Sequence, residues 1–260
     1  MLTYPATIPP STRSLTHLTD LLRTHRQRLG TRYRRLDPGR QALLVLAHLR
    51  NGDTPARLAG GFEISPTTAW RYIREAVDLL AAAAPTLAHA MTGIAWLAYP
   101  ILDGTLIRTD RLSGPQDRRH YSGKHRCHGV NAQVIADPAG RLKWISPALP
   151  GSTHDLTAAR AHGIIEALTA EQVMTFADKG YQGAGGSIRT PFKRHRRRPR
   201  LSRREKAVNR SHAKIRAVGE RAIATVKCWK LLTKLHCCPK RATALLAAIL
   251  VLQLIEEQRH

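Results

Sequence analysis

Three acidic residues stand at the ends of apolar segments, or within a helical one, in a chain that has few acids. Asp103 follows a strand-like run in ILDGT, Asp178 ends another in FADKGY, and Glu220 lies in RAVGERAIATVK. The chain has 18 Asp and Glu against 42 Lys and Arg, so acids at such positions indicate more than solubility. Carboxylates that folding brings together can hold two divalent cations about 3.5–4 Å apart, which activates water for phosphodiester cleavage. The sequence therefore predicts a fold in which these three segments meet.

The charge of the chain indicates a polyanionic partner. Its formal net charge is +24 and its isoelectric point is near 11.2, which favours nucleic acid over the alternative, a basic protein at a membrane surface. The 260 residues, 43% of them hydrophobic, can bury a core as one large domain or as a small and a medium one. The longest apolar run, residues 244–252, is too short to cross a bilayer, and no secretory signal opens the chain. We therefore expect a cytoplasmic protein that reaches the nucleoid through DNA and binds no membrane.

The cysteine pattern predicts reduced thiols. No C-x2-C pair occurs, and the adjacent Cys237 and Cys238 cannot readily bridge to each other. Histidines flank Cys127 and precede Cys237, which leaves zinc binding as an alternative, but the spacings are not those of tetrahedral zinc sites.

The first third of the chain predicts a small all-α domain. Asp37, Thr54 and Ser65 each stand directly before a proline, which places an N-cap side chain ahead of a proline at the first helical position. A short helix, a glycine-containing turn and a longer helix form the helix-turn-helix pattern. The helices expected from these three starts cover residues 38–51, about 55–59 and 66–82.

The last of these helices has an apolar face and a basic face. Its apolar stripe should pack on Leu43, Leu44, Leu46 and Leu58, and consists of Trp70, Ile73, Val77 and Leu80. The other face holds Thr67, Arg71 and Arg74, whose side chains could reach bases or phosphates in a major groove. The alternative is an ordinary three-helix bundle with a solvated basic face.

The rest of the chain predicts an α/β domain. We expect a basic N-terminal arm at 1–36, the helix-turn-helix domain at 37–92 and a catalytic domain at 93–260. In the catalytic domain three strands, a helix, a strand and then helices follow the order of an RNase H-like mixed sheet flanked by helices. The expected strands are 96–107, 129–136, 142–146, 173–177 and 188–192, and the expected helices are 153–168, 211–231 and 242–257.

In such a fold the acids would come from different elements. Asp103 and Asp178 would lie on two strands and Glu220 on a later helix. Arg216, Glu220 and Lys227 fall within about 40° of one another on that helix, so a metal-binding acid would lie between two cations suited to phosphates. The alternative is an ordinary Arg–Glu surface pair worth a few tenths of a kcal/mol.

Five segments resemble the transposases of bacterial insertion sequences in the DDE superfamily, in the group related to PIF/Harbinger elements. They are ILDGT, YSGKHRCHGVNAQVIAD, PALPGSTHD, FADKGYQG and RAVGERAIATVK. The triad of that family falls on Asp103, Asp178 and Glu220, which implies two Mg²⁺ ions, or Mn²⁺, as cofactors. The family's tyrosine ahead of the arginine has no counterpart, because Ala213 occupies that position and His212 stands beside it.

A fourth acid, Asp155 in GSTHD, opens the helix expected after the third strand. It could be a metal ligand or support one, or it could simply complement the dipole at the start of the helix. Tyr121, Ser122, Gly123 and Lys124 lie in another matching segment, and the sequence assigns them no role.

A basic run lies between the second aspartate and the helix with Glu220. Residues 193–206 contain nine Lys or Arg in fourteen positions. The run could be a solvated, disordered loop, and Arg196, Arg197 and Arg198 could also contact DNA phosphates near the scissile strand. These two interpretations are compatible.

Together these features lead us to expect a DNA transposase. It would bind double-stranded DNA at the element ends through the helix-turn-helix, cleave a strand, and join the 3′-OH to target DNA. Bringing two ends together implies a homodimer in the active complex. One alternative is a nuclease of the same fold without strand transfer; another is a DNA-binding repressor derived from a dead transposase, against which the intact acids argue.

Overall fold

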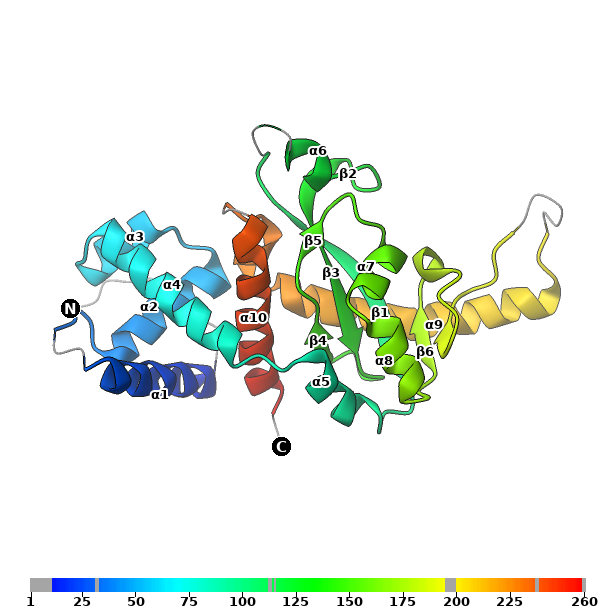
Figure 1. Ribbon diagram of the computed structural model, residues 1–260, viewed down its shortest axis with the longest axis horizontal. Helices are drawn as coiled ribbons and strands as arrows, with labels where there is room; N and C mark the ends of the chain where they lie inside the picture. Colours follow the sequence, from blue (N-terminus) through cyan, green and yellow to red (C-terminus); the bar gives the residue numbers. More distant parts are fainter. Residues whose placement is uncertain are drawn as a thin grey trace. The chain divides into compact units, whose positions relative to one another are not determined.

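The computed structural model describes residues 11–30, 33–111, 114, 116–194, 200–236 and 239–258 (Figure 1). Its contacts divide the chain into two units. The first contains Met1–Ala84, Val226–Leu235 and Thr243–His260, and the second contains Pro85–Thr225 and His236–Ala242. This division differs from the expected one, because the boundary falls after Ala84 and the C-terminal helix joins the N-terminal unit.

The three helix starts predicted from the proline positions are confirmed. Helices α2 (Pro38–Asn51), α3 (Pro55–Phe62) and α4 (Pro66–Ala82) follow the expected N-caps. The Asp37 carboxylate accepts a hydrogen bond from Arg40 N at 3.0 Å, and the Ser65 hydroxyl accepts one from Thr68 N at 3.2 Å. Helix α3 continues through the two glycines expected in the turn, because Phe62 in its last turn is buried.

Helix α4 packs through a different face from the one expected at its start. Ile73, Val77 and Leu80 are buried, but Trp70 is 49% exposed. The prediction for Trp70 is therefore wrong: Ala69, one residue earlier, occupies the buried position in that turn. The Trp70 ring lies outside, with the Arg74 guanidinium carbon 5.2 Å from its centroid.

The segment expected to be a basic arm contains a helix that belongs to the first unit. Helix α1 (Thr12–Leu29) buries Leu18 and Leu22, which are four residues apart on one face. In the segment that follows, Arg34 makes two hydrogen bonds to the Glu75 carboxylate of α4, at 2.9 and 3.0 Å. This part of the chain is therefore folded against the helix-turn-helix.

The C-terminal helix α10 (Ala242–Glu257) has the predicted bounds but packs in the first unit. Helices that are apolar on most sides must be buried on most sides, and α10 is of this kind. The Glu256 carboxylate accepts hydrogen bonds from Ser11 N and Ser11 Oγ at 2.8 and 2.9 Å. The buried Trp229, just before the 3-10 helix η2 (Lys230–Thr233), donates to the Gln253 side chain at 3.2 Å. Among the described residues no single helix is long and apolar enough to cross a membrane, although α4 and the short helix α5 (Leu87–Ile94) counted together would reach that criterion.

The second unit is built on a mixed sheet of the expected RNase H-like kind. Strand β1 (Ile101–Arg108) pairs antiparallel with β3 (Cys127–Ala136) and parallel with β6 (Thr175–Ala177), which pairs parallel with β7 (Ile188–Arg189). Strands β2 (Tyr121–Ser122), β4 (Leu142–Ile145) and β5 (Leu149–Pro150) pair with different parts of β3. The predicted strand order is confirmed, although β1, β6 and β7 are shorter than expected.

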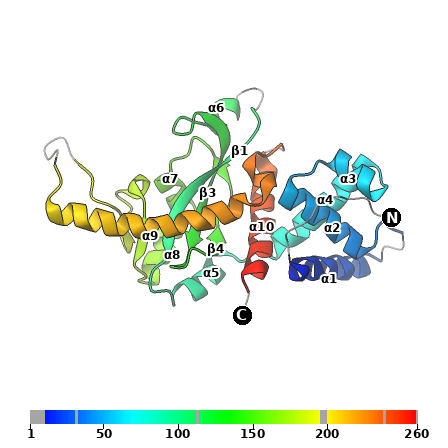
Figure 2. The ribbon, with the colours of Figure 1, turned by 180° about the vertical axis from the view of Figure 1, so that it is seen from behind.

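Helices cover both faces of this sheet (Figures 1 and 2). Helices α7 (Asp155–Ala161) and α8 (Ile164–Ala170) lie on one face and α9 (Arg203–Lys227) on the other. The single helix expected at 153–168 is broken because Gly163 has the left-handed φ of 67°. Shorter helices of this unit are α5 (Leu87–Ile94), α6 (Gln116–His120), η1 (Lys179–Tyr181) and η3 (Pro239–Arg241).

Helix α9 begins eight residues before the expected start at 211. A capping box explains this: the Ser202 hydroxyl accepts from Glu205 N at 3.1 Å, and the Glu205 carboxylate accepts from Ser202 N at 2.7 Å. The end of the basic run is therefore the first turn of α9. Arg196, Arg197 and Arg198 lie outside the described residues.

Candidate active site

Asp103 on β1 and Asp178, directly after β6, lie at neighbouring positions of two paired strands. Strand β1 pairs in parallel with β6, and Leu102 is opposite Ala177. The next residue along the chain is an aspartate in both cases, and adjacent strands lie about 4.8 Å apart. Asp178 also begins η1, where its Oδ1 accepts a hydrogen bond from Gly180 N at 2.6 Å. The parallel pairing thus brings together two acids that are far apart in the sequence.

The environment of Asp103 disfavours its charged form. Burial raises the pKa of Asp103 from 3.8 to about 6; the nearby Arg216 opposes this, and the carboxylates of Asp178 and Asp155 add to it. The Arg216 guanidinium lies 3.8 Å from Asp103 Oδ2. A divalent cation would relieve the repulsion between these carboxylates, which are the hard oxygen donors that such ions prefer.

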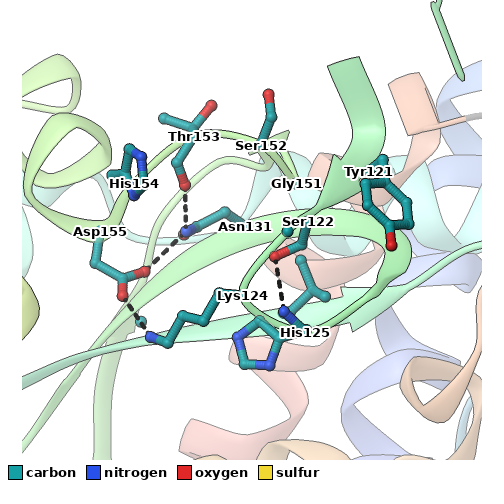
Figure 3. Close-up of a pocket in the computed structure, with 13 residues that line it drawn as sticks. Tyr121, Ser122, Lys124, His125, Asn131, Gly151, Ser152, Thr153, His154 and Asp155 are labelled. Carbon is teal, nitrogen blue, oxygen red and sulfur yellow. Dashed lines mark hydrogen bonds and ion pairs between the residues drawn. The ribbon is translucent and has the colours of Figure 1, made fainter. Parts of the chain in front are cut away.

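Asp155, the first residue of α7, is a third carboxylate whose charge acts on Asp103. Its Oδ1 accepts from Asn131 Nδ2 at 2.9 Å, and its Oδ2 lies 3.1 Å from Lys124 Nζ (Figure 3). Its carboxylate lies directly over Gly104, so a Cβ at Gly104 would overlap it. A Cβ at Gly180 would lie 3.3 Å from Asp155 Oδ2. The glycines that follow Asp103 and Asp178 thus leave room for this third carboxylate.

A buried chain of polar side chains supports Asp155. The Tyr181 hydroxyl donates to Gln133 Oε1, and Gln133 Nε2 donates to Asn131 Oδ1 at 2.8 Å. Burial first, and then the three carboxylates, raise the pKa of Tyr181 well above its usual value, so it stays a neutral donor. None of Asn131, Gln133 and Tyr181 was predicted from the sequence. The pattern that could have indicated them is the pair of polar residues, Asn131 and Gln133, on one face of an otherwise apolar strand.

Glu220 is not gathered with the aspartates. Helix α9 packs closely on β1, where a Cβ at Gly219 would lie 2.6 Å from Ile101 Cγ2. Arg216, one turn before Glu220, contacts Asp103, whereas Glu220 is exposed and makes no hydrogen bond or ion pair with any described residue. Lys227, the last residue of α9, is also exposed.

Two cationic side chains neutralise the acids in this structure. Burial would lower the pKa of Lys124, but the carboxylates of Asp155, Asp178 and Asp103 raise it. The second cation is the Arg216 guanidinium, 3.8 Å from Asp103 Oδ2. Within the described ranges, no three carboxylate, imidazole or thiol groups lie close enough to hold one metal ion. The carboxylates of Asp103, Asp178 and Asp155 are oxygen donors of the kind that hard divalent cations prefer.

The predicted DNA-contacting residues of α4 are accessible. Thr67, Arg71 and Arg74 are all exposed. Arg74 also makes contacts inside the domain, because it stacks on Trp70 and its Nε lies 4.0 Å from Asp78. Arg71 is thus the better placed of the two arginines to meet a partner.

Both parts of the chain match family models of one superfamily. Residues 102–253 match the family model described as DDE superfamily endonuclease, and residues 34–86 match the helix-turn-helix of DDE superfamily endonuclease. Endonucleases of this superfamily generally use divalent metal ions. The "Putative transposase for insertion sequence element IS112" of Streptomyces albus G is 31% identical over 193 residues, which cover 74% of this chain and 70% of that protein.

A solved structure, "Crystal structure of the Mos1 Strand Transfer Complex", overlaps 78% of both chains at 11% identity. Its TM-score of 0.23 is too low to support an argument. The two family models and the curated relative suffice: this chain belongs to the DDE superfamily of endonucleases and is a DNA transposase.

Proposed function

We propose that this transposase binds the ends of an insertion sequence, cuts a DNA strand there with the help of divalent cations, and joins the freed 3′-OH to target DNA. The observation that supports this most directly is the parallel pairing of β1 with β6, which sets Asp103 beside Asp178. Acids held this way are suited to metal ligation rather than to solubility, because burial first, and then the neighbouring carboxylates, raise the pKa of Asp103.

Asp103, Asp178 and Glu220 would hold two Mg²⁺ ions, or Mn²⁺, with Asp155 as a further ligand or support. When bound, the ions would activate the attacking water and stabilise the leaving oxygen. Asp103 has to lose its proton to act as a ligand, and Arg216 favours that loss. Asn131 would keep the Asp155 carboxylate aimed at the same edge, because it donates to one of its oxygens.

Other residues would hold the DNA. Thr67, Arg71 and Arg74 would enter a major groove of the element end from the exposed face of α4. Arg196, Arg197 and Arg198, with Arg216 and Lys227, would contact phosphates. A homodimer would hold two ends together, and the enzyme would act on DNA in the bacterial cytoplasm.

The decisive experiment is incubation of the protein with its own flanking DNA and Mg²⁺. We expect cleavage at the element ends and joining of these ends to a target duplex. Asp103→Asn and Asp178→Asn should bind the DNA but neither cut nor join it. Cutting without joining would reduce the proposal to a nuclease, and binding by a wild-type chain that never cuts would reduce it to a DNA-binding protein.

A further inference from the structure

A cavity of about 360 Å³ lies beside the aspartates. Residues 121–125 form one wall and residues 151–155 the other (Figure 3). The floor consists of Gly104, Leu106 and Asn131, which share one face of the sheet because Leu106 is paired with Asn131. Binding sites for small molecules start at about 300 Å³. The cavity therefore suits one group of about the size of a nucleotide.

The walls of this cavity are held by backbone contacts. Gly151 N donates to Gly129 O at 3.0 Å, and Ser152 N donates to Arg119 O at 3.2 Å. A Cβ at Gly151 would lie 2.5 Å from Gly129 O, so only glycine permits this approach. Asn131 Nδ2 donates to Thr153 O at 3.0 Å and thus ties the second wall to the floor. The cavity is therefore formed before any ligand arrives.

An aromatic ring stands at the rim of the cavity in a fixed orientation. The Tyr121 side chain lines the cavity and is 43% exposed, so its ring is accessible to a partner. Its ring packs edge to face against His128, at 5.2 Å between centroids. His128 is itself held by Asp117, whose Oδ1 lies 2.9 Å from His128 Nε2. Exposed rings of this kind stack against nucleic-acid bases with little regard to sequence.

The rest of the lining suits a phosphate and leads to the acids. Lys124, His125 and His154 line the cavity, and their nitrogens can donate to phosphate oxygens. Lys124 lies 3.1 Å from Asp155, which belongs both to the cavity and to the cluster with Asp103 and Asp178. A DNA strand with a phosphate at the aspartates would therefore have a neighbouring nucleotide at this cavity.

We propose that the cavity holds one unpaired nucleotide of the cut DNA strand, with its base against Tyr121 and its phosphate near Lys124. The proposal rests on the proposed function, because the strand cut at the aspartates supplies the nucleotide. Taking a base out of a duplex costs free energy, and the cost is least at unpaired or mismatched positions. The cavity would therefore favour DNA that is already open beside the cut.

The test compares two oligonucleotides of roughly ten nucleotides, a length within the site sizes of proteins that bind single-stranded nucleic acid. One is oligothymidine and the other is an abasic strand with the same phosphates, so the charge-dependent part of binding cancels in the ratio of their dissociation constants. Binding is measured by fluorescence anisotropy in EDTA, where no metal-dependent cutting occurs. We expect the preference for oligothymidine to fall about 5- to 150-fold in Tyr121→Ala, the range for one stacked aromatic.

Matched variants make the result specific. Tyr121→Phe keeps the ring and should keep the preference, and Tyr121→Leu keeps apolar bulk against His128 and should lose it. Trp96→Ala removes an aromatic ring that is 90% exposed and does not line the cavity, and it should change nothing. An unchanged preference in both Tyr121→Ala and Tyr121→Leu would overturn the proposal. Cleavage is assayed separately with Mg²⁺. A protein that cuts DNA but shows no base preference that depends on Tyr121 would contradict the cavity proposal and leave the proposed function intact.

Discussion

The acids at the sheet edge and the exposed face of α4 differ in how the fold prepares them for DNA. Asp103, Asp155 and Asp178 are held by strand pairing and hydrogen bonds, and burial and neighbouring carboxylates disfavour the charged form of Asp103. Arg71 and Arg74 project from a helix surface. The aspartates require a cation that removes the repulsion between their carboxylates. The arginines of α4 require only that DNA can reach them. Metal and pH should therefore govern the sheet edge, and salt and base sequence should govern α4.

The largest expected effect is the loss of cleavage when a strand aspartate loses its charge. Asp103→Asn and Asp178→Asn keep the side-chain volume but remove a ligand, so we expect Mg²⁺-dependent cleavage to fall by about a thousandfold or more, as several kcal/mol of metal stabilisation are lost. DNA binding should persist, because α4 is untouched. Asp110→Asn, at an exposed acid beyond the opposite end of β1, is the control and should cut normally. Normal cutting by either strand variant would remove that aspartate from the site.

A second prediction separates the two helices that could supply the third carboxylate. Glu220→Gln should lose as much activity as the strand variants if α9 provides the ligand. Asp155→Asn should lose about 10- to 100-fold, the range for residues that support ligands. Glu166→Gln, at an exposed acid of α8, should have no effect. If Asp155→Asn is inactive and Glu220→Gln is active, the third ligand belongs to α7, where the structure already places the Asp155 carboxylate near the other two.

A third prediction concerns the stability of the metal-free protein against pH. The pKa of Asp103 is raised from 3.8 to about 6 in the fold, so between these values the native state binds more protons than the unfolded state. The free energy of unfolding should therefore fall by up to about 3 kcal/mol for this group as the pH rises from about 4 to 6. Above pH 6 the contribution of this group should stay level. Asp103→Asn should lack this fall and should be the more stable protein at pH 8.

Denaturant unfolding of both proteins at pH 4, 6 and 8 in EDTA measures this difference. Added Mg²⁺ should stabilise the wild type at pH 8 far more than at pH 4, where Asp103 is protonated. If the free energy of unfolding depends on pH in the same way in the two proteins, the pKa of Asp103 is not raised. The expected difference between the sheet edge, governed by pH, and α4, governed by salt, would then be contradicted.

The smallest expected effect is at the exposed face of α4. Arg71→Ala should weaken binding to element ends by about 1–3 kcal/mol, and the loss should depend on one base pair if the side chain reads a base edge. Arg71→Lys keeps the charge but not the forked donor geometry, so it should restore non-specific binding and leave the base preference lost. A loss that is equal for all sequences would make Arg71 a phosphate contact. Titrations against DNA with single base-pair changes, at fixed salt, give the answer.

Local features of the fold could be predicted well because their causes are local. The N-caps at Asp37 and Ser65 act within three residues, and the helices that follow begin where the prolines indicate. The order of strands and helices along the chain follows from apolar runs and turns, and the neighbouring positions of Asp103 and Asp178 were expected from the RNase H-like arrangement of such elements. The start of α9 was missed although the capping box at Ser202 and Glu205 is equally local.

The sequence by itself determined the helix-turn-helix and the order of strands and helices along the chain, since each depends on short-range periodicity or on local turn and capping residues. Only the tertiary structure decided that Asp103 and Asp178 lie side by side and which groups surround them. Asp155 lies over Gly104 and accepts a hydrogen bond from Asn131. This is possible because the register of β1 and β3 aligns residues nearly thirty positions apart. The close packing of α9 on β1 likewise sets Arg216, and not Glu220, against Asp103. Such contacts depend on the exact meeting of distant segments, which no local pattern encodes.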